Sequence, residues 1–460
     1  MEGLYASILR RIEPTEEDRR RAAGLSNRLL SSLSGELLRR GIEAEVRVEG
    51  SFAKDTWLRG ENDLDLFVLL PPSAPEGRLR EVVEAARALR GRKRERYAEH
   101  PYLEVEVGGY RVEVVPCFGV EDPSRMRSAV DRTPFHTRYV KERLDEALRR
   151  EVRLLKRFMM GTGCYGAELR VGGFSGYLCE LLVLHSRSFE GLVREASGWK
   201  PGHVIDLEGF YPDPSKVRLL FPDQPLVVVD PVDRTRNVAA AVSAQKFSTF
   251  VLACREFLRR PSERFFFPRP QRVLGREELW RLMRRRGTEF FCVTFRTPRV
   301  VEDVLYPQLR KAERALGFTL GERGFQVLGS EVWSGERLSA VLLEVFPSSL
   351  PPLEVRRGPP PSAPEESFLR KYLGKKGTWA GPYVDLEGRP VFEVERRVRE
   401  AGEVLEGAVG RGAGLGKHVG EALSRGFKIH RGREVLGLCR EEGFSSFLSE
   451  YLTRRLPWYR

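Results

Sequence analysis

The sequence predicts an α+β protein built from several domains. With 460 residues the chain is too long for one hydrophobic core, and two to four domains are expected. Helix and strand patterns are interleaved up to about residue 140, helical spacing of apolar residues dominates up to about residue 260, and strands return beyond it. We therefore expect domains at 1–140, 141–260 and 261–460.

The first region combines helices with a small sheet. Leucines repeat at helical spacing from Arg20 to Arg40, and a second helix is expected from Gly77 to Leu89. The apolar run Leu64–Leu70 suits a central strand, and Gly108–Gly109 predicts a hairpin turn between two later strands. The remaining expected elements are strands at 43–49, 102–107 and 110–115 and a short helix at 52–58.

The middle region is expected to be helical and the last region mixed. Apolar residues from Leu144 to Met159 recur at helical spacing, and two further helices are predicted at 176–188 and 237–257. The elements predicted after them are helices at 277–286 and 305–316 and strands at 290–296, 325–328 and 339–346. This mixture indicates an α+β C-terminal domain.

Composition excludes several classes of protein. No apolar run is long enough to span a membrane and no signal peptide is evident, so a cytoplasmic protein is expected. The six cysteines include no C-x-x-C pair, which argues against a zinc site or a disulfide framework and favours reduced, buried thiols. The net charge of +13 favours a polyanionic partner, because Lys and Arg bind phosphates.

The most informative motif is Asp63–Leu64–Asp65, which leads into the apolar strand. Side chains two positions apart on a strand point to the same face, so the two carboxylates are neighbours. Carboxylates this close repel each other unless a cation lies between them, and oxygen ligands favour Mg²⁺. Because such a pair also occurs by chance on surface strands, its surroundings decide the interpretation.

Two further features make this pair a candidate centre for phosphate transfer. Gly50 and Ser51 open a short helix, where free N–H groups and the Ser hydroxyl can hold a triphosphate and Gly lets the backbone approach closely. Glu113 lies on the outward face of the strand at 110–115 and is the candidate third acid of a two-metal site. Together these features predict in-line attack of a hydroxyl on an α-phosphorus.

The string EGSFAKDTWLRGENDLDLFVLL, from Glu49 to Leu70, resembles the catalytic motif of the DNA polymerase β-like nucleotidyltransferase superfamily. Nine further strings resemble the archaeal-type, class I CCA-adding tRNA nucleotidyltransferases. They are RYAEHPY (96–102), VEVVPCF (112–118), SAVDRTPFH (128–136), EVRLLKRF (151–158), YGAE (165–168), GFSGYLCELL (173–182), VVDPVDRTRNVAA (228–240), LYPQL (305–309) and GLGKHVGEAL (414–423). The resemblance runs nearly from end to end.

This resemblance implies a polymerase β-like palm as the nucleotidyltransferase head, a helical neck like that of poly(A) polymerases and oligoadenylate synthetases, and an α+β, RRM-like body with a tail. It implies template-independent addition of C, C and A to the 3′ end of tRNA from CTP and ATP, with release of pyrophosphate. Mg²⁺ is the implied cofactor, and Asp63, Asp65 and Glu113 match its catalytic ligands.

The resemblance also implies a nucleotide pocket. Ser51 and Lys54 would contact the triphosphate. The other implied pocket residues, which would bind phosphate or ribose hydroxyls, are His136, Lys156, Tyr165, Ser175 and Tyr177. Each has a structural alternative: His136 follows a turn, Lys156 lies beside the apolar stripe of its helix and suits a solvated lysine, and the tyrosines suit ordinary interfacial positions.

Arg236, with Asp230 and Asp233 upstream, matches the segment that reads the incoming base in the family. A guanidinium can donate hydrogen bonds to acceptors on C and be repositioned for A. The structural alternative is an ion pair between Arg236 and Asp233.

Two positions depart from the family pattern. The family usually has Asp where this chain has Glu113, and Arg where it has Lys54, which lacks the bidentate fork of a guanidinium. Glu104 and Glu106, on the preceding strand, are rival metal ligands outside the matched position.

The glycine-rich stretch from Gly407 to Gly420 is not a P-loop, because His418 stands where Ser or Thr is required. The resemblance makes Lys417 and His418 part of a tRNA-binding element at the TψC elbow, with the basic run 259–286 as a candidate contact for the acceptor stem. Relatives often form homodimers, so a homodimer is expected. Two other functions stay open: a poly(A)- or oligoadenylate-type RNA nucleotidyltransferase, and a catalytically silent tRNA-binding relative.

Overall fold

The structure is a computed structural model that describes residues 1–97, 100–412 and 414–460. It divides into two compact units, one made of Met1–Arg269 and Leu456–Arg460, the other of Pro270–Arg455. Two residues of the RYAEHPY string, Ala98 and Glu99, and Ala413 of the glycine-rich stretch lie outside the described residues. The α+β multidomain fold class is confirmed, and the boundaries of the three domains stay a prediction.

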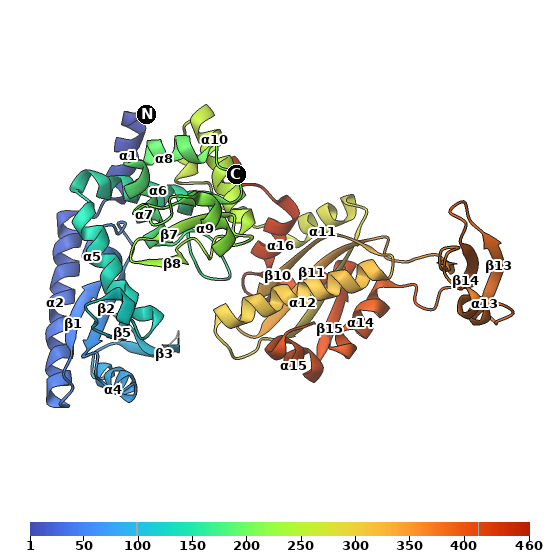
Figure 1. Ribbon diagram of the computed structural model, residues 1–460, viewed down its shortest axis with the longest axis horizontal. Coiled ribbons are helices and arrows are strands. Elements are labelled where there is room, and N and C mark those ends of the chain that lie inside the picture. The colour runs from blue at the N-terminus through green and yellow to red at the C-terminus, as the bar shows by residue number, and fades with distance from the viewer. Residues whose placement is uncertain (98–99, 413) are drawn as a thin grey trace. The chain divides into compact units, whose positions relative to one another are not determined.

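A five-stranded sheet forms the N-terminal part of the first unit, with the strand order β1-β2-β5-β4-β3 (Figure 1). Its central strands β2 (Asp63–Leu70) and β5 (Tyr110–Phe118) run parallel, and the other neighbours are antiparallel. The edge strands are β1 (Glu45–Glu49) and β3 (Arg92–Tyr97), and β4 (Pro101–Val107) lies between β5 and β3. The apolar run of the sequence thus forms a central strand, as predicted.

One face of this sheet packs against α2 (Glu16–Arg39) and α4 (Gly77–Ala86). Leu64, Leu66 and Val68 of β2 are buried in the core that these helices share with the sheet. Because side chains alternate along a strand, Asp63 and Asp65 lie on the other face. The core that forms on one side therefore directs both carboxylates to the opposite side, which we call the carboxylate face.

Helices and a small sheet make up the rest of the first unit. Its helices are α1 (Glu2–Ile12), α3 (Gly50–Lys54), α5 (Thr133–Arg143), α6 (Glu146–Thr162), α7 (Gly176–Ser186), α8 (Phe189–Ala196), α9 (Pro214–Leu220) and α10 (Ala244–Arg259). The small sheet has the order β6-β7-β8, with β6 (His203–Ile205), β7 (Leu226–Asp230) and β8 (Asp233–Asn237). Phe158 of α6 lies at the centre of a large apolar core, surrounded by other phenylalanines.

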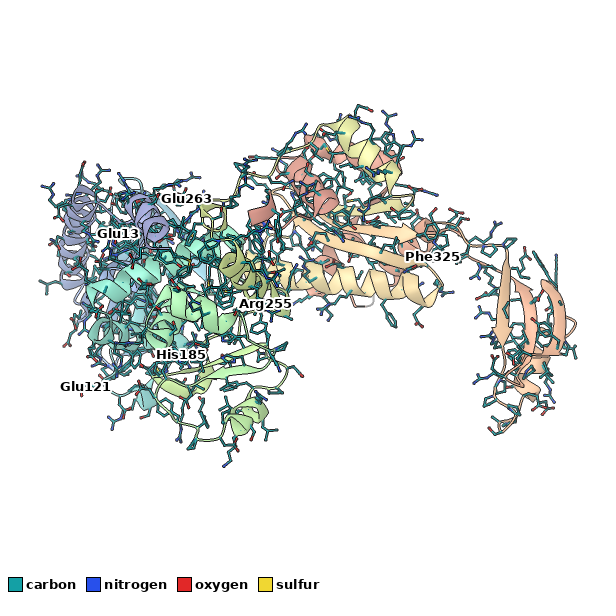
Figure 2. The ribbon with its side chains drawn as sticks, turned by 90° about the horizontal axis from the view of Figure 1, so that it is seen from above. Glu13, Glu121, His185, Arg255, Glu263 and Phe325 are labelled. Carbon is teal, nitrogen blue, oxygen red and sulfur yellow. The ribbon has the colours of Figure 1, made fainter. Side chains whose placement is uncertain are left out.

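Ion pairs at the surface join α1 to this helical part. Arg150 of α6 donates from Nε to Glu13 at 2.8 Å, and Arg11 of α1 lies 3.2 Å from Glu263. Figure 2 labels Glu13 and Glu263, the acidic partners in these two ion pairs. The N-terminal helix is therefore packed on the helices that follow the first sheet.

The helix predicted over 237–257 is wrong in its first part. Asn237 ends β8, and α10 begins only at Ala244. The side chain of Asn237 accepts a hydrogen bond from the N–H of Val228 at 2.9 Å and donates to the carbonyl of Leu226 at 3.0 Å. These contacts bind Asn237 to β7, and Ser243 then caps α10 through the N–H of Lys246.

The second unit is built around a four-stranded sheet with the order β10-β11-β9-β15 (Figure 1). Its strands are β9 (Glu289–Arg296), β10 (Gln326–Ser334), β11 (Leu338–Phe346) and β15 (Phe427–Arg431). Its helices are α11 (Arg276–Arg285), α12 (Glu302–Glu322), α14 (Ala401–Arg411), α15 (Lys417–Arg425) and α16 (Phe444–Thr453). One face packs against α12, α14 and α15, and the other against α11 and α16.

A second, three-stranded sheet in this unit has the order β12-β14-β13, with β12 (Leu353–Arg357), β13 (Thr378–Val384) and β14 (Pro390–Glu395). The helix α13 (Glu366–Tyr372) lies between β12 and β13 in the chain.

Among the residues that the structure describes, no helix is long and apolar enough to cross a membrane. The six cysteines are free thiols, and five of them are buried.

Candidate active site

Asp65 and Glu113 are neighbours across the parallel strands β2 and β5. The register pairs Asp65 with Glu113 and Asp63 with Arg111, so the four side chains share the carboxylate face. The Nε of Arg111 lies 2.8 Å from Oδ1 of Asp63. The sheet therefore brings together the three carboxylates that the sequence predicted, with one of them already paired to a cation.

The two central carboxylates belong to a row that crosses the sheet. Glu49 of β1 is the register partner of Asp65, and Glu104 of β4 is the partner of Glu113. Like charges placed directly opposite each other destabilise a sheet unless a cation or a proton intervenes. Glu104 has such a cation, because Nε of Arg96 lies 3.4 Å from its Oε2. This ion pair makes Glu104 less available than Glu113 as a ligand.

Burial, together with neighbouring charges, raises two pKa values on the carboxylate face. Burial, followed by the charge of Glu113, raises the pKa of Asp65 to about 7. Burial also raises the pKa of Glu113, where Arg111 opposes the shift and Asp63 adds to it. The Asp65 side chain is still partly exposed at the surface, so it is crowded by protein atoms without being sealed from solvent. A cation bound next to such a carboxyl group would stabilise its ionised form and lower its pKa.

Gly50 brings the first turn of α3 against the carboxylate of Asp65. Its φ is +67°, a left-handed conformation that favours glycine. A β-carbon at this position would overlap Oδ2 of Asp65 and lie 2.9 Å from its Cγ. Ser51 follows in the same turn and is half-buried. The glycine therefore places the predicted triphosphate loop directly beside the carboxylate of Asp65.

The donors in this row suit a hard divalent cation, although they do not form a closed ligand set. Within residues 1–97, 100–412 and 414–460, no group of three or more His, Cys, Asp or Glu side chains is arranged to hold a metal ion. Mg²⁺ usually binds through one or two carboxylates together with substrate phosphates. Asp65 and Glu113 fit that requirement, whereas Asp63 would have to leave Arg111 to join them.

Lys54 and Lys156 meet at a buried carboxylate from α7. Lys54 donates from Nζ to Oε2 of Glu180 at 2.6 Å, and Nζ of Lys156 lies 3.7 Å from Oε1. Lys156 also donates to the carbonyl of Thr56 at 3.0 Å. Both lysines are buried, so the alternative of a solvated Lys156 is wrong. Lys156 lies beside the apolar stripe of its helix and can be buried because its charge is paired with Glu180.

His136, Tyr177 and Arg236 converge on Asp230 at the end of β7. Asp230 is fully buried and accepts a hydrogen bond from Arg236 at 2.6 Å. Nε2 of His136 lies 2.9 Å from the same carboxylate, and the Tyr177 hydroxyl donates to it at 3.3 Å. The imidazole stacks on the Tyr177 ring, with 4.0 Å between centroids. Three of the predicted pocket residues thus share one anchor.

Burial and mutual contacts shift the pKa values of Asp230 and His136 in this cluster. Burial raises the pKa of Asp230, but the contacts of His136 and Arg236 more than offset it, so its net pKa lies below the usual range. Burial lowers the pKa of His136, which favours a neutral imidazole. The alternative ion pair between Arg236 and Asp233 is wrong, because Asp233 pairs instead with Arg132 at 3.1 Å.

Tyr165 and Ser175 lie close to the lysines. A β-carbon on Gly176 would lie 3.1 Å from the Tyr165 hydroxyl and 3.5 Å from Nζ of Lys156, so these two groups flank the start of α7. Ser175 caps this helix by accepting a hydrogen bond from the N–H of Leu178 at 3.1 Å. Ser175 therefore has a structural role, whatever it contributes to binding.

Lys417 and His418 lie in the second unit, in the first turn of α15. Lys417 is exposed and His418 is half-buried. The side-chain oxygen of Gln308, in the LYPQL string on α12, accepts a hydrogen bond from the N–H of His418 at 2.8 Å. Gly416, with φ +80°, permits this approach. Two strings that carried the family resemblance are therefore in direct contact.

Glu180 is a residue of this region that the sequence interpretation did not single out. It is the acidic residue inside the apolar run Leu178–Leu184, within a string that was quoted only for its resemblance. A carboxylate in an apolar helix must be paired when the helix is buried, and that signal was available in the sequence. The identity of its partners was not, because Lys54 lies 126 residues away.

Comparison with known proteins identifies the family. The model of the nucleotidyltransferase domain matches residues 30–136, the second domain of tRNA nucleotidyltransferases matches 150–267, and the C-terminal domain of the CCA-adding enzyme matches 286–432. A solved structure of the Cid1 poly(U) polymerase covers 56% of this chain and 94% of its own, with 16% identity and a TM-score of 0.45.

Curated relatives match over the full length. The CCA-adding enzyme of Methanothermobacter thermautotrophicus is 41% identical over 99% of this chain and 98% of its own length. That of Methanopyrus kandleri is 40% identical over 96% of this chain and 92% of its own, and that of Halobacterium salinarum is 38% identical over 98% of each. Together with the carboxylate pair and the matched domains, these similarities show that the chain belongs to the family of CCA-adding tRNA nucleotidyltransferases.

Proposed function

We propose that this protein adds cytidine, cytidine and adenosine in turn to the 3′ end of tRNA, using CTP and ATP and releasing pyrophosphate, without a nucleic-acid template. One observation carries the chemistry: Asp65 and Glu113 pair in register on the carboxylate face, against the turn that Gly50 begins. Full-length similarity to CCA-adding enzymes supports the choice of substrates and product.

Asp65, Glu113 and Asp63 are the proposed holders of Mg²⁺. When bound there, Mg²⁺ supplies charge neutralisation on the phosphates and lowers the pKa of the attacking tRNA 3′-hydroxyl. Asp65 would have to be ionised to hold the cation, and burial and the charge of Glu113 raise its pKa to about 7 when no cation is bound. Arg111 pairs with Asp63 and so limits repulsion within the row.

The nucleotide is proposed to lie between two groups of side chains. The first group lies around the short helix α3 and the start of α7 and is assigned to the triphosphate; it consists of Ser51, Lys54, Lys156, Tyr165 and Ser175. His136, Tyr177 and Arg236 form the second group and are assigned to the ribose and the base. Asp230 supports this assignment, since it fixes the direction of the Arg236 guanidinium.

Binding of tRNA is assigned to the C-terminal region, with Lys417 and His418 at the TψC elbow and the basic run 259–286 at the acceptor stem. The net charge of +13 supports a polyanionic partner. A homodimer and a cytoplasmic location complete the proposal. The six free cysteines support a reducing compartment.

The other two functions receive less support. A poly(A)- or oligoadenylate-type enzyme shares the carboxylate centre, but the match of residues 286–432 to the C-terminal domain of CCA-adding enzymes favours tRNA as the acceptor. A catalytically silent relative has no need for carboxylates in register beside a turn that only glycine fits.

Incubation with Mg²⁺ and tRNA that lacks its CCA end tests the proposal, with each nucleotide offered singly and in combination. We expect two C residues from CTP alone and one further A when ATP is added. Long A tails would favour the poly(A)-type enzyme, and the absence of any incorporation would favour the silent relative.

A further inference from the structure

A cluster of buried charges lies where α7 meets the loop that follows α3. Glu180 is fully buried, and its two carboxylate oxygens each receive a short hydrogen bond. Lys54 donates to Oε2 at 2.6 Å, and the Thr56 hydroxyl donates to Oε1 at 2.6 Å. Lys156 completes the cluster, with Nζ at 3.7 Å from Oε1 and hydrogen bonds to the carbonyl and hydroxyl of Thr56.

This cluster holds more positive than negative charge. Burial raises the pKa of Glu180, but Lys54 and Lys156 more than offset it, so its net pKa is lowered and the carboxylate stays ionised. Two ammonium groups therefore share one carboxylate in a place that water hardly reaches. Buried charge without a partner is unfavourable, so this surplus favours the binding of an anion nearby.

Stability alone does not explain the cluster. The loop is already fixed to α6 by Arg153, which donates to the carbonyls of Asp55 and Trp57 at 2.5 and 3.2 Å and lies 2.8 Å from the Asp55 carboxylate. A buried ion pair is often no more stable than apolar residues of similar volume. A second set of buried charges beside Arg153 therefore points to a role in binding.

Both lysines also lie close to other parts of the proposed site. The charge of Lys54 acts on Asp65, where it opposes the rise in pKa, and its ammonium group lies 5.8 Å from the centre of the Tyr177 ring. Lys156 flanks the start of α7 together with Tyr165. The two ammonium groups therefore lie near both the carboxylate face and the side chains that converge on Asp230.

We propose that Glu180 is a positioning residue that holds Lys54 and Lys156 side by side, so that their ammonium groups bind the β- and γ-phosphates of the incoming nucleotide together. The inference rests on the proposed function for the identity of the nucleotide. Glu180 does not contact the substrate itself. Without its negative charge the two ammonium groups repel each other, and the pair no longer presents a joint site for a triphosphate.

The test compares ligands with and without the two outer phosphates. We expect Glu180→Gln to weaken binding of CTP and of inorganic tripolyphosphate about tenfold by calorimetry, while binding of CMP changes less than about twofold. In steady-state extension of tRNA, KM for CTP should rise by a similar factor and kcat should change less than about threefold. Unchanged binding of CTP, or an equal loss for CTP and CMP, would overturn the inference.

Glu344→Gln is the matched control. Glu344 is a buried carboxylate of β11 that pairs with Arg286 at 2.6 Å and accepts hydrogen bonds from Thr288 and Tyr451, in the second unit. The control should lose thermal stability and keep its affinity for CTP. A tenfold loss of affinity in this control would show that reduced stability explains the effect, and would contradict the inference.

Thr56→Val gives a second route if Glu180→Gln does not fold. It removes one donor to Glu180 and one acceptor for Lys156, while Lys156 keeps its hydrogen bond to the Thr56 carbonyl, so we expect CTP affinity to fall about threefold with CMP affinity unchanged. Equal affinity of this variant and the parent for CTP would contradict the inference. Extension of tRNA by the parent protein is measured in parallel, so failure of the proposed function is seen separately from failure of the role of Glu180.

Discussion

Gly50 and Asp65 are in such close contact that a β-carbon on the glycine would overlap Oδ2 of the carboxylate. Gly50 also has a φ of +67°, which a residue with a β-carbon adopts only with strain. The carboxylate pair and the predicted triphosphate loop are therefore linked at one backbone position. Any side chain at residue 50 must displace the proposed metal ligand or the turn.

Gly50→Ala should reduce the rate of cytidine addition at least about 100-fold, because the new methyl group displaces Asp65. The backbone strain itself costs about 1–2 kcal/mol, so the variant should still fold. Gly41→Ala is the control, since Gly41 has φ +65° and nothing within 4 Å of its β-carbon position. Equal activity of the two variants, measured by extension of labelled tRNA, would show that the contact with Asp65 is not needed.

Asp65 should make the metal-free protein less stable as the pH rises. Its pKa in the folded protein is about 7, compared with 3.8 in the unfolded chain, so the folded state binds more protons between these values. Stability falls where the folded state binds the extra proton. Asp65→Asn removes this effect and should be more stable than the parent by about 1–3 kcal/mol at pH 8, with the difference vanishing near pH 4. Denaturation in EDTA at both pH values measures it, and a variant that is less stable at pH 8 would contradict the assigned shift.

Glu113 and Glu104 should differ in their effects, although they face each other across β5 and β4. Glu113→Ala should reduce turnover about 100-fold or more, equivalent to about 2.7 kcal/mol in the barrier, whereas Glu113→Asp should retain most activity. Glu104→Ala is the control, because Glu104 is paired with Arg96, and should change turnover less than about tenfold. Rates are measured across a series of Mg²⁺ concentrations. The reverse order of effects would assign the third ligand to Glu104.

Asp230 should control the choice of nucleotide through Arg236. Asp230→Asn removes the charge that holds the guanidinium and the imidazole of His136, so KM for CTP should rise about tenfold and incorporation of UTP should increase. Asp233→Asn is the control on the neighbouring strand, since Asp233 pairs with Arg132 instead. Competition between CTP and UTP for the first addition measures the effect. Unchanged discrimination in Asp230→Asn would separate Arg236 from base selection.

Local patterns in the sequence predicted the parts of the site that depend on one element. Alternation along β2 and β5 predicted the face that Asp65 and Glu113 share, because a buried strand has only two faces. Their register across the parallel pair was not predictable from either strand. The segment around Asn237 misled the helix prediction, since its amide binds β7 and a turn follows.

Contacts between distant elements account for the rest. Lys156 was open to interpretation as a solvated lysine because its partner Glu180 comes from another helix. Arg236 had two acids upstream, and only the folded structure shows that Asp230 is the partner. Pairings of this kind depend on tertiary packing, which charge spacing along the chain does not encode.

The central claim is that Asp65, together with Glu113 and Asp63, forms the reaction centre, and the rate of the first cytidine addition tests it most directly. In a single turnover with saturating CTP, Mg²⁺ and tRNA lacking CCA, Asp65→Ala should be slower than the parent by at least about 1,000-fold, equivalent to about 4 kcal/mol. Near-ultraviolet circular dichroism and tRNA affinity should match those of the parent. An Asp65→Ala protein that adds cytidine at the parental rate would contradict the account.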